Sequence, residues 1–225
     1  MGGRGYSSAT SRRSESGRAK GFTIDTGADF QKISTGMAPM DAINMAADQI
    51  VGLDYEMAVM VTPDGTMYVS SGKANSVIPP YKQVEADGFS VSETLDLHNH
   101  PSPGKRPFGG PSSSSDWNAM FSFGQTENHI VAKEGRYIMR ITDQSKIDKA
   151  KAFFTNRKKS GYWFERKQSN FEKNIKKTYE AGMWDKYSEP GGSLKAAMHT
   201  LEKFGPRYGF ELEFRPNPGW ENLYK

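Results

Sequence analysis

The sequence of 225 residues contains no cysteine and only four histidines. The lack of cysteine excludes disulfides, a thiolate nucleophile and every zinc site that uses cysteine ligands. A metal site would therefore have to combine histidine with carboxylates. The sequence also lacks the GxxxxGK[ST] and GxGxxG patterns that cradle nucleotide phosphates, so nothing in it indicates a nucleotide site.

Long apolar runs are missing as well. Uncharged apolar stretches such as Met57–Val61 are far shorter than the roughly 20 residues that a membrane crossing needs. Residues 1–20 contain arginine but no apolar core of the kind found in secretory signals. We therefore expect a cytoplasmic protein that has no membrane partner.

Charge is unevenly distributed along the chain. Residues 1–20 carry five basic residues and one acidic residue, whereas residues 21–143 carry eight basic and fifteen acidic ones. Residues 144–187 are basic again, with twelve basic against five acidic residues. This pattern indicates an acidic globular body with basic flanks, through which nucleic acid could bind, and not a uniformly basic nucleic-acid binder.

Hydrophobic periodicity predicts an α/β fold. Its elements are a helix over 39–51, a hairpin of strands 55–61 and 66–70 with Asp64-Gly65 in the turn, a strand ending near His98, a helix over 115–123, and a second hairpin of strands 127–133 and 136–141. Lys-rich helical sequence follows, with a helix over 193–204 and a strand over 208–214. We predict a disordered tail over 1–20, a mixed α/β domain over 21–143, and a basic, mainly helical extension over 144–225 that packs on the core.

The segment that carries chemistry is Leu97-His98-Asn99-His100-Pro101, followed by Ser113-Ser-Ser-Asp116. Strand side chains alternate in direction, so His98 and His100 point to one side, where one cation can bridge them, and Asn99 points away. Asp116 returns a carboxylate at the start of a helix. Two imidazoles and one carboxylate are a ligand set of catalytic zinc sites, in which water takes the fourth position.

This segment resembles the JAMM metallopeptidases, also called the MPN+ or JAB domain. Their pattern is an upstream Glu, then His-x-His-Pro, then Ser-x-x-Asp, and they are zinc hydrolases that cleave peptide or isopeptide bonds, typically at the end of ubiquitin or ubiquitin-like modifiers. The resemblance covers roughly residues 39–143 and implies a small mixed sheet flanked by helices. The opening residues and the pattern of the body also resemble JAB-like proteins of bacterial mobile elements and phages.

The resemblance assigns roles to individual residues. His98, His100 and Asp116 would hold Zn²⁺, Glu56 would be the general base to the metal-bound water, and Ser113 would stabilise the oxyanion. This sequence departs from the family in one respect. The family has a shorter stretch between the second His and the Ser, whereas twelve residues lie between His100 and Ser113 here.

That longer stretch is rich in glycine and proline and could loop out without moving the ligands. Lys105, Arg106 and Phe108 would then stand at the rim of a substrate groove, and Gly109-Gly110 would make the loop flexible.

Competing candidates remain for some roles. Glu85 and Glu93 are rivals of Glu56, and Asp54 is one residue out of phase with it. His129 is expected to be a buried structural residue and His199 a surface residue. The Lys/aromatic run 158–167 could stack on single-stranded nucleic acid, although aromatic side chains docked on the body explain it better.

The expected function is a zinc-dependent hydrolase that cleaves peptide or isopeptide bonds in a protein or peptide substrate, for example a ubiquitin-like one. The alternative is a RadC-like or catalytically inactive JAB domain that serves as a nucleic-acid-binding or scaffold module.

Overall fold

The computed structural model describes residues 21–102, 109–155, 157–158, 161–162, 167 and 190–221. The expected basic tail over 1–20, the loop residues Lys105, Arg106 and Phe108, and most of the Lys-rich segment 156–189 lie outside the described residues. The predictions made for them are therefore not addressed by the structure.

A seven-stranded sheet with the order β1-β3-β2-β4-β5-β6-β9 forms the centre of the protein. Its strands are β1 (Phe30–Ser34), β2 (Met57–Val61), β3 (Thr66–Ser71), β4 (Leu95–His100), β5 (Glu127–Ala132), β6 (Gly135–Ile141) and β9 (Phe210–Pro216). Strands β4 and β5 are parallel, and every other neighbouring pair is antiparallel. A separate short hairpin joins β7 (Arg157–Lys158) to β8 (Gly161–Tyr162).

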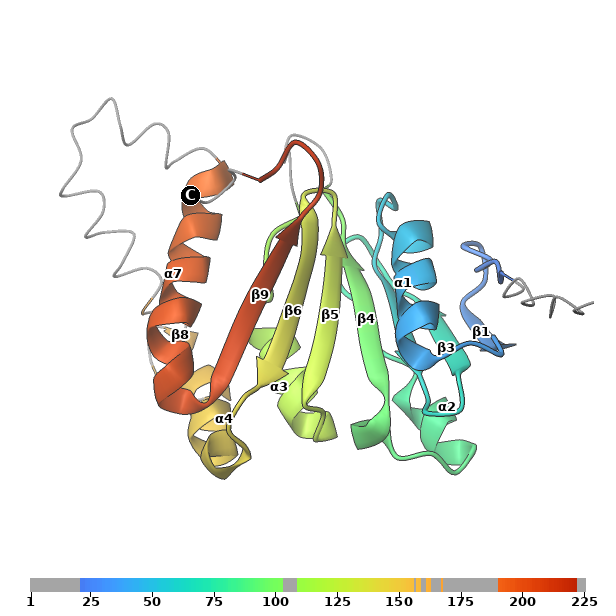
Figure 1. Ribbon diagram of the computed structural model, residues 1–225, viewed down its shortest axis with the longest axis horizontal. Helices are drawn as coiled ribbons and strands as arrows, with labels where there is room; N and C mark the ends of the chain where they lie inside the picture. The colour runs from blue at the N-terminus through green and yellow to red at the C-terminus, as the bar shows by residue number, and fades with distance from the viewer. Residues whose placement is uncertain are drawn as a thin grey trace, which may run out of the picture.

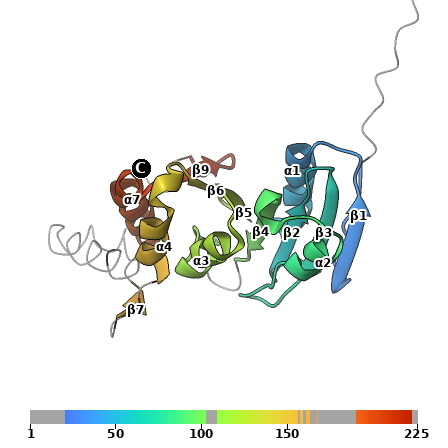
Figure 2. The same cartoon turned by 90° about the horizontal axis from the view of Figure 1, so that it is seen from below.

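Helices cover both faces of this sheet. They are α1 (Pro39–Ile50), α2 (Tyr81–Ala86), α3 (Ser114–Phe123), α4 (Ile147–Thr155) and α7 (Pro190–Tyr208), with 3-10 turns at Val91–Glu93 and Gln144–Lys146. Helix α1 lies on one face, and α2, α3 and α4 lie on the other (Figures 1 and 2). The expectation of a mixed sheet flanked by helices is confirmed.

Helix α1 begins at Pro39, whose fixed φ suits the first helical position and whose missing N–H costs nothing there. Its apolar face is fully buried against the sheet and consists of Ala42, Ile43, Ala46, Ala47 and Ile50. Strand β2 is buried along its whole length because helices cover it from both sides. The candidate metal site described below therefore rests on the central strand pair β2 and β4.

The parallel pairing of β4 and β5 decides where a site can form. Two parallel strands need a crossover connection, and here the chain crosses from β4 to β5 through α3. The carboxyl end of β4 and the N-terminus of α3 therefore lie at the same edge of the sheet. In open α/β sheets this is the place where ligands bind.

The C-terminal segment is built into the same core. Strand β9 pairs with β6 along its full length, and Phe153 and Phe154 of α4 are completely buried. The ring of Phe154 stacks on that of Trp117 from α3, with centroids 4.7 Å apart and an interplanar angle of 10°. Within the part of the chain that the structure describes, no helix combines the length and apolar character needed to span a membrane.

Candidate metal centre

Two histidines at the end of β4 point to the same face of the sheet, as strand alternation predicts. The Nε2 atoms of His98 and His100 lie 3.2 Å apart. At this distance the two nitrogens cannot both carry a hydrogen on the facing side, so at least one of them presents a lone pair. The side chains retain 12% and 14% of their surface exposed, which leaves this pair nearly buried and yet accessible from solvent.

Asp116 enters the site as the third residue of α3. Ser113 is the N-cap: its Oγ accepts hydrogen bonds from the backbone N–H groups of Ser115 and Asp116. In the reciprocal direction, the Asp116 carboxylate accepts a hydrogen bond from the Ser113 N–H at 2.6 Å. This capping box fixes the carboxylate at the helix N-terminus, where the helix dipole favours negative charge.

The three side chains converge on one point. Asp116 Oδ1 lies 3.4 Å from His98 Nε2, and Asp116 Oδ2 lies 3.6 Å from His100 Nε2. The two nitrogens are 3.2 Å apart, and one ligand atom from each of the three residues lies within 4.8 Å of the other two. Tetrahedral ligands at about 2.05 Å from a metal lie about 3.3 Å apart. This His–His–Asp group could therefore bind a metal ion.

The orientation of His100 is set by a chain of hydrogen bonds that starts elsewhere in the fold. Its Nδ1 lies 3.0 Å from the Gly110 carbonyl oxygen, which can only accept, so Nδ1 carries the proton and Nε2 presents a lone pair. The Gly110 N–H in turn donates to the carboxylate of Glu134 at 2.7 Å, and the Gly109 N–H donates to the same carboxylate at 2.9 Å. Tyr137 donates its hydroxyl to Glu134 at 3.0 Å.

The prediction that Gly109 and Gly110 merely make the loop flexible is wrong. A Cβ at Gly109 would overlap the His100 carbonyl oxygen and would lie 2.9 Å from the His100 Cβ. Gly110 has φ +93°, in the left-handed region that favours glycine. Gly109 is thus required by its close approach to His100, and Gly110 by its left-handed backbone conformation.

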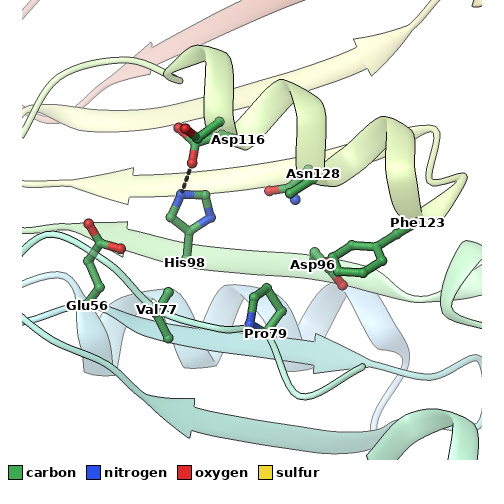
Figure 3. A pocket seen from close by; sticks show the side chains of 10 residues that line it. Glu56, Val77, Pro79, Asp96, His98, Asp116, Phe123 and Asn128 are labelled. Atoms are coloured by element: carbon green, nitrogen blue, oxygen red, sulfur yellow. Dashed lines mark ion pairs between the residues drawn. The ribbon is translucent and has the colours of Figure 1, made fainter. Parts of the chain in front are cut away.

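Glu56 faces the same site from the neighbouring strand. Ala58 pairs with His98 in the β2–β4 register, so Glu56, two residues earlier, lies opposite His100, and their side chains point to one face. Figure 3 shows the Glu56 carboxylate on the same side of the sheet as His98 and Asp116. The resemblance expected this residue near the metal, and the structure brings it into the same cleft as His98 and Asp116.

Asn99 points to the opposite face, as predicted, and supports Glu56 from behind. Its Oδ1 accepts the Met57 N–H at 2.6 Å, and its Nδ2 donates to the Tyr55 carbonyl at 2.9 Å. The two peptide groups on either side of Glu56 are therefore held by the residue that separates His98 from His100.

Burial and charge shift the titration of these groups. Burial raises the pKa of Glu56, and the charge of Asp116 adds to the rise while that of His98 opposes it. Burial acts to raise the pKa of Asp116 as well, but its hydrogen bond with His98 and the charges of both imidazoles hold that pKa well below its usual range. Burial lowers the pKa of His100. Asp116 is thus an anion and His100 a neutral imidazole at neutral pH.

A cleft of about 190 Å³ opens beside this group. Its lining includes Glu56, His98 and Asp116, and it continues along α3 past Ala119 to Phe123. The remaining lining residues are Val77, Pro79, Asp96, Ser115 and Asn128. The candidate metal site is therefore one end of a cleft large enough to admit part of a substrate.

Other sequence candidates lie apart from this cleft. Glu85 is on α2 and Glu93 on a 3-10 turn, and neither lines it. His129 is buried and bonds Glu127 at 2.7 Å, and His199 is exposed, both as expected. Glu134 was missed by sequence reasoning. The signal for it was weak, because a glutamate before a glycine in a hairpin turn is ordinarily exposed.

Comparison with known proteins adds no identity. No protein-family model matches the chain, and neither a curated protein nor a solved structure matches it significantly.

Proposed function

We propose that this protein is a zinc-dependent hydrolase of the JAMM type, which cleaves peptide or isopeptide bonds in a protein or peptide substrate. The observation that carries the proposal is the convergence of His98, His100 and Asp116 at one end of a cleft that also contains Glu56. The two Nε2 atoms lie 3.2 Å apart, and each faces one carboxylate oxygen of Asp116, at 3.4 and 3.6 Å.

The donor set favours zinc over other cations. Two imidazole nitrogens and one carboxylate oxygen suit a borderline cation such as Zn²⁺, whereas Mg²⁺ and Ca²⁺ prefer all-oxygen sites. Three protein ligands leave one coordination position open, which is the pattern of catalytic zinc sites. When bound there, zinc would act as a Lewis acid and lower the pKa of water to about 7.

Glu56 is the proposed general base. Its carboxylate lines the cleft, and its pKa is raised by burial, which brings it closer to the working pH of a base that must also return the proton. It would accept a proton from the attacking water and then deliver that proton to the leaving amine. General acid–base catalysis of this kind contributes roughly 10²–10⁴ in rate.

Ser113 is the proposed oxyanion donor. Its Oγ accepts two backbone N–H groups at the start of α3, so the hydroxyl hydrogen is not engaged by the cap and is left for another acceptor. A hydroxyl held in place beside Asp116 could donate to the developing oxyanion of a tetrahedral intermediate.

The test combines metal analysis with hydrolysis. Elemental analysis of the purified chain should find one zinc per molecule in the wild type and none in His100→Ala. Glu56→Gln should keep its zinc and lose roughly 10²–10⁴ in the rate of cleavage of peptide or ubiquitin-like substrates. Glu85→Gln, which changes a glutamate outside the cleft, is the matched control and should cleave at the wild-type rate.

A wild type without zinc, or a Glu56→Gln variant that cleaves at the wild-type rate, would overturn the proposal. Full zinc content with no cleavage of any substrate would instead favour the binding or scaffold module.

A further inference from the structure

The cleft continues well beyond the metal-binding group. Asp96 lies two residues before His98 on β4 and thus on the same face, roughly 7 Å further along the strand. Asn128 is its register partner on the parallel strand β5. On α3, Asp116 and Phe123 are seven residues apart, so both lie on the helix face that lines the cleft, roughly 10 Å from one another. The cleft therefore has a metal end and a far end.

The far end is rich in hydrogen-bond acceptors. Asp96 is 3% exposed, and its Oδ1 accepts the Thr94 hydroxyl at 3.1 Å. Asn128 is 6% exposed, and its Oδ1 has no hydrogen-bond partner among the described residues. Among these residues no lysine or arginine lines the cleft to balance the Asp96 carboxylate. A buried acceptor without a partner normally has a ligand or a water to satisfy it.

The walls between the two ends are apolar. Val77 and Pro79 form one side, and Ala119 and Phe123 of α3 form the other. Figure 3 shows the Phe123 ring beside Asp96, with Asn128 across the cleft from Pro79. A ligand bound at the far end would thus pass between these apolar walls. Its terminal group would lie beside the Phe123 ring and the Asp96 carboxylate.

We propose that this cleft is a subsite for a basic side chain of the substrate, one with an unbranched aliphatic stem and a cationic head. The stem would lie between Pro79 and Ala119. The head would donate hydrogen bonds to Asp96 and Asn128 Oδ1 and contact the face of the Phe123 ring. This inference deepens the proposed function, because the metal end marks where the scissile bond would lie.

Binding of two small probes to the zinc-loaded full-length chain tests the subsite. n-Butylguanidinium carries a cationic head on a four-carbon stem, and n-butylurea is its neutral counterpart of similar shape. Titrations followed by NMR chemical shifts should give an affinity for n-butylguanidinium at least about tenfold higher than for n-butylurea, the usual scale for a hydrogen-bonded charge. Equal affinities in the wild type would overturn the proposal.

Three variants locate the binding. Asp96→Asn should lower the affinity for n-butylguanidinium by about tenfold and leave the affinity for n-butylurea nearly unchanged. Ala119→Met should fill the space between the apolar walls and lower the affinity for both probes. Asn118→Met changes the neighbouring exposed position of the same helix and should lower neither affinity. If Asp96→Asn does not fold, the comparison of Ala119→Met with Asn118→Met still shows whether the probes bind in this cleft. Wild-type binding of both probes to Ala119→Met would overturn the assignment of the cleft.

The two proposals fail in different ways. A chain that binds zinc and cleaves substrates but does not discriminate between the probes lacks the subsite and keeps the proposed function. A chain that prefers n-butylguanidinium but takes up no zinc keeps the subsite and loses the proposed function.

Discussion

The carboxylate of Glu134 accepts a hydrogen bond from the Gly110 N–H at 2.7 Å, and so connects the β5–β6 turn to the candidate metal site. Gly110 also contacts the site directly, because its carbonyl oxygen accepts a hydrogen bond from His100 Nδ1 at 3.0 Å. Glu134 is completely buried, and three donors satisfy its carboxylate. A residue far from the ligands in the sequence therefore orients one of them.

The first prediction follows from this chain of bonds. Glu134→Ala should lower the affinity for zinc by roughly 10–100-fold, because outer-shell partners of metal-ligating histidines have effects of that size. A competition titration against a chromophoric chelator measures it. Glu134→Gln keeps an acceptor for one of the two glycine N–H groups, so its zinc affinity should lie between those of Glu134→Ala and the wild type. Glu85→Ala, at an exposed position, is the control and should leave the zinc affinity unchanged. An unchanged zinc affinity in Glu134→Ala would mean that this chain of hydrogen bonds does not orient His100.

The second prediction concerns Asn99. Asn99→Ala leaves the Met57 N–H and the Tyr55 carbonyl without their side-chain partner, which should lower the free energy of unfolding by about 1–3 kcal/mol. It should also slow hydrolysis while zinc content is kept, because Glu56 is no longer held. Adding Asn99→Ala to Glu56→Gln should then slow the reaction no further. Additive losses in this double-variant cycle would mean that Asn99 acts only through stability.

Most of the sheet could be predicted because its strands carry clear signals. The two hairpins are marked by turn residues between apolar runs, and β2, β3, β5 and β6 follow them closely. Strand β1 was missed because its sequence, FQKIS, alternates too weakly and lies at the sheet edge with little burial. Helix α2 has only six residues and one fully buried side chain, which is too short for periodicity to detect.

The convergence of the three candidate metal ligands could be predicted because each is positioned by a local rule. Strand alternation puts His98 and His100 on one face, and a capping box places Asp116 at the start of α3. Glu134 and the far end of the cleft could not be predicted. Their positions depend on the register of β4 with β5 and on a turn that folds back on the loop, and neither is encoded locally.

The third prediction separates capping from metal binding. Ser113→Ala removes the acceptor for two N–H groups at the start of α3, so the free energy of unfolding should fall by about 1 kcal/mol while zinc is retained. Asp116→Asn keeps a side-chain oxygen for the capping box and should lose zinc. Denaturant unfolding and elemental analysis measure both. Loss of zinc from Ser113→Ala to the same extent would show that the cap, not the carboxylate charge, controls binding.

The fourth prediction is a loss of stability in acid. Hydrogen bonds from Arg215 and Arg140 lower the pKa of Glu213 to about 2, against an ordinary 4.5. The unfolded state therefore binds the proton first, so the stabilisation is present above the ordinary value and is lost as the pH falls toward 2. Because Glu213 is partly exposed, its contribution should be below about 1 kcal/mol. Glu213→Gln should lower Tm near neutrality, and its curve should meet the wild type near pH 2. Parallel curves would contradict this.

The fifth prediction tests how firmly the C-terminal segment belongs to the core. Phe154 is completely buried between Trp117 and Phe210, with ring centroids 4.7 and 5.0 Å away. Phe154→Ala should therefore lower the free energy of unfolding by about 3–5 kcal/mol, as large-to-small changes in a close-packed core do. Exposed Lys149→Ala on the same helix should change it by less than about 0.5 kcal/mol. Urea unfolding followed by tryptophan fluorescence measures both. A Phe154→Ala variant as stable as the wild type would mean that α4 is a loosely attached appendage. A large loss of stability would instead place α4 among the elements that support α3 and, through α3, the Asp116 carboxylate of the candidate metal centre.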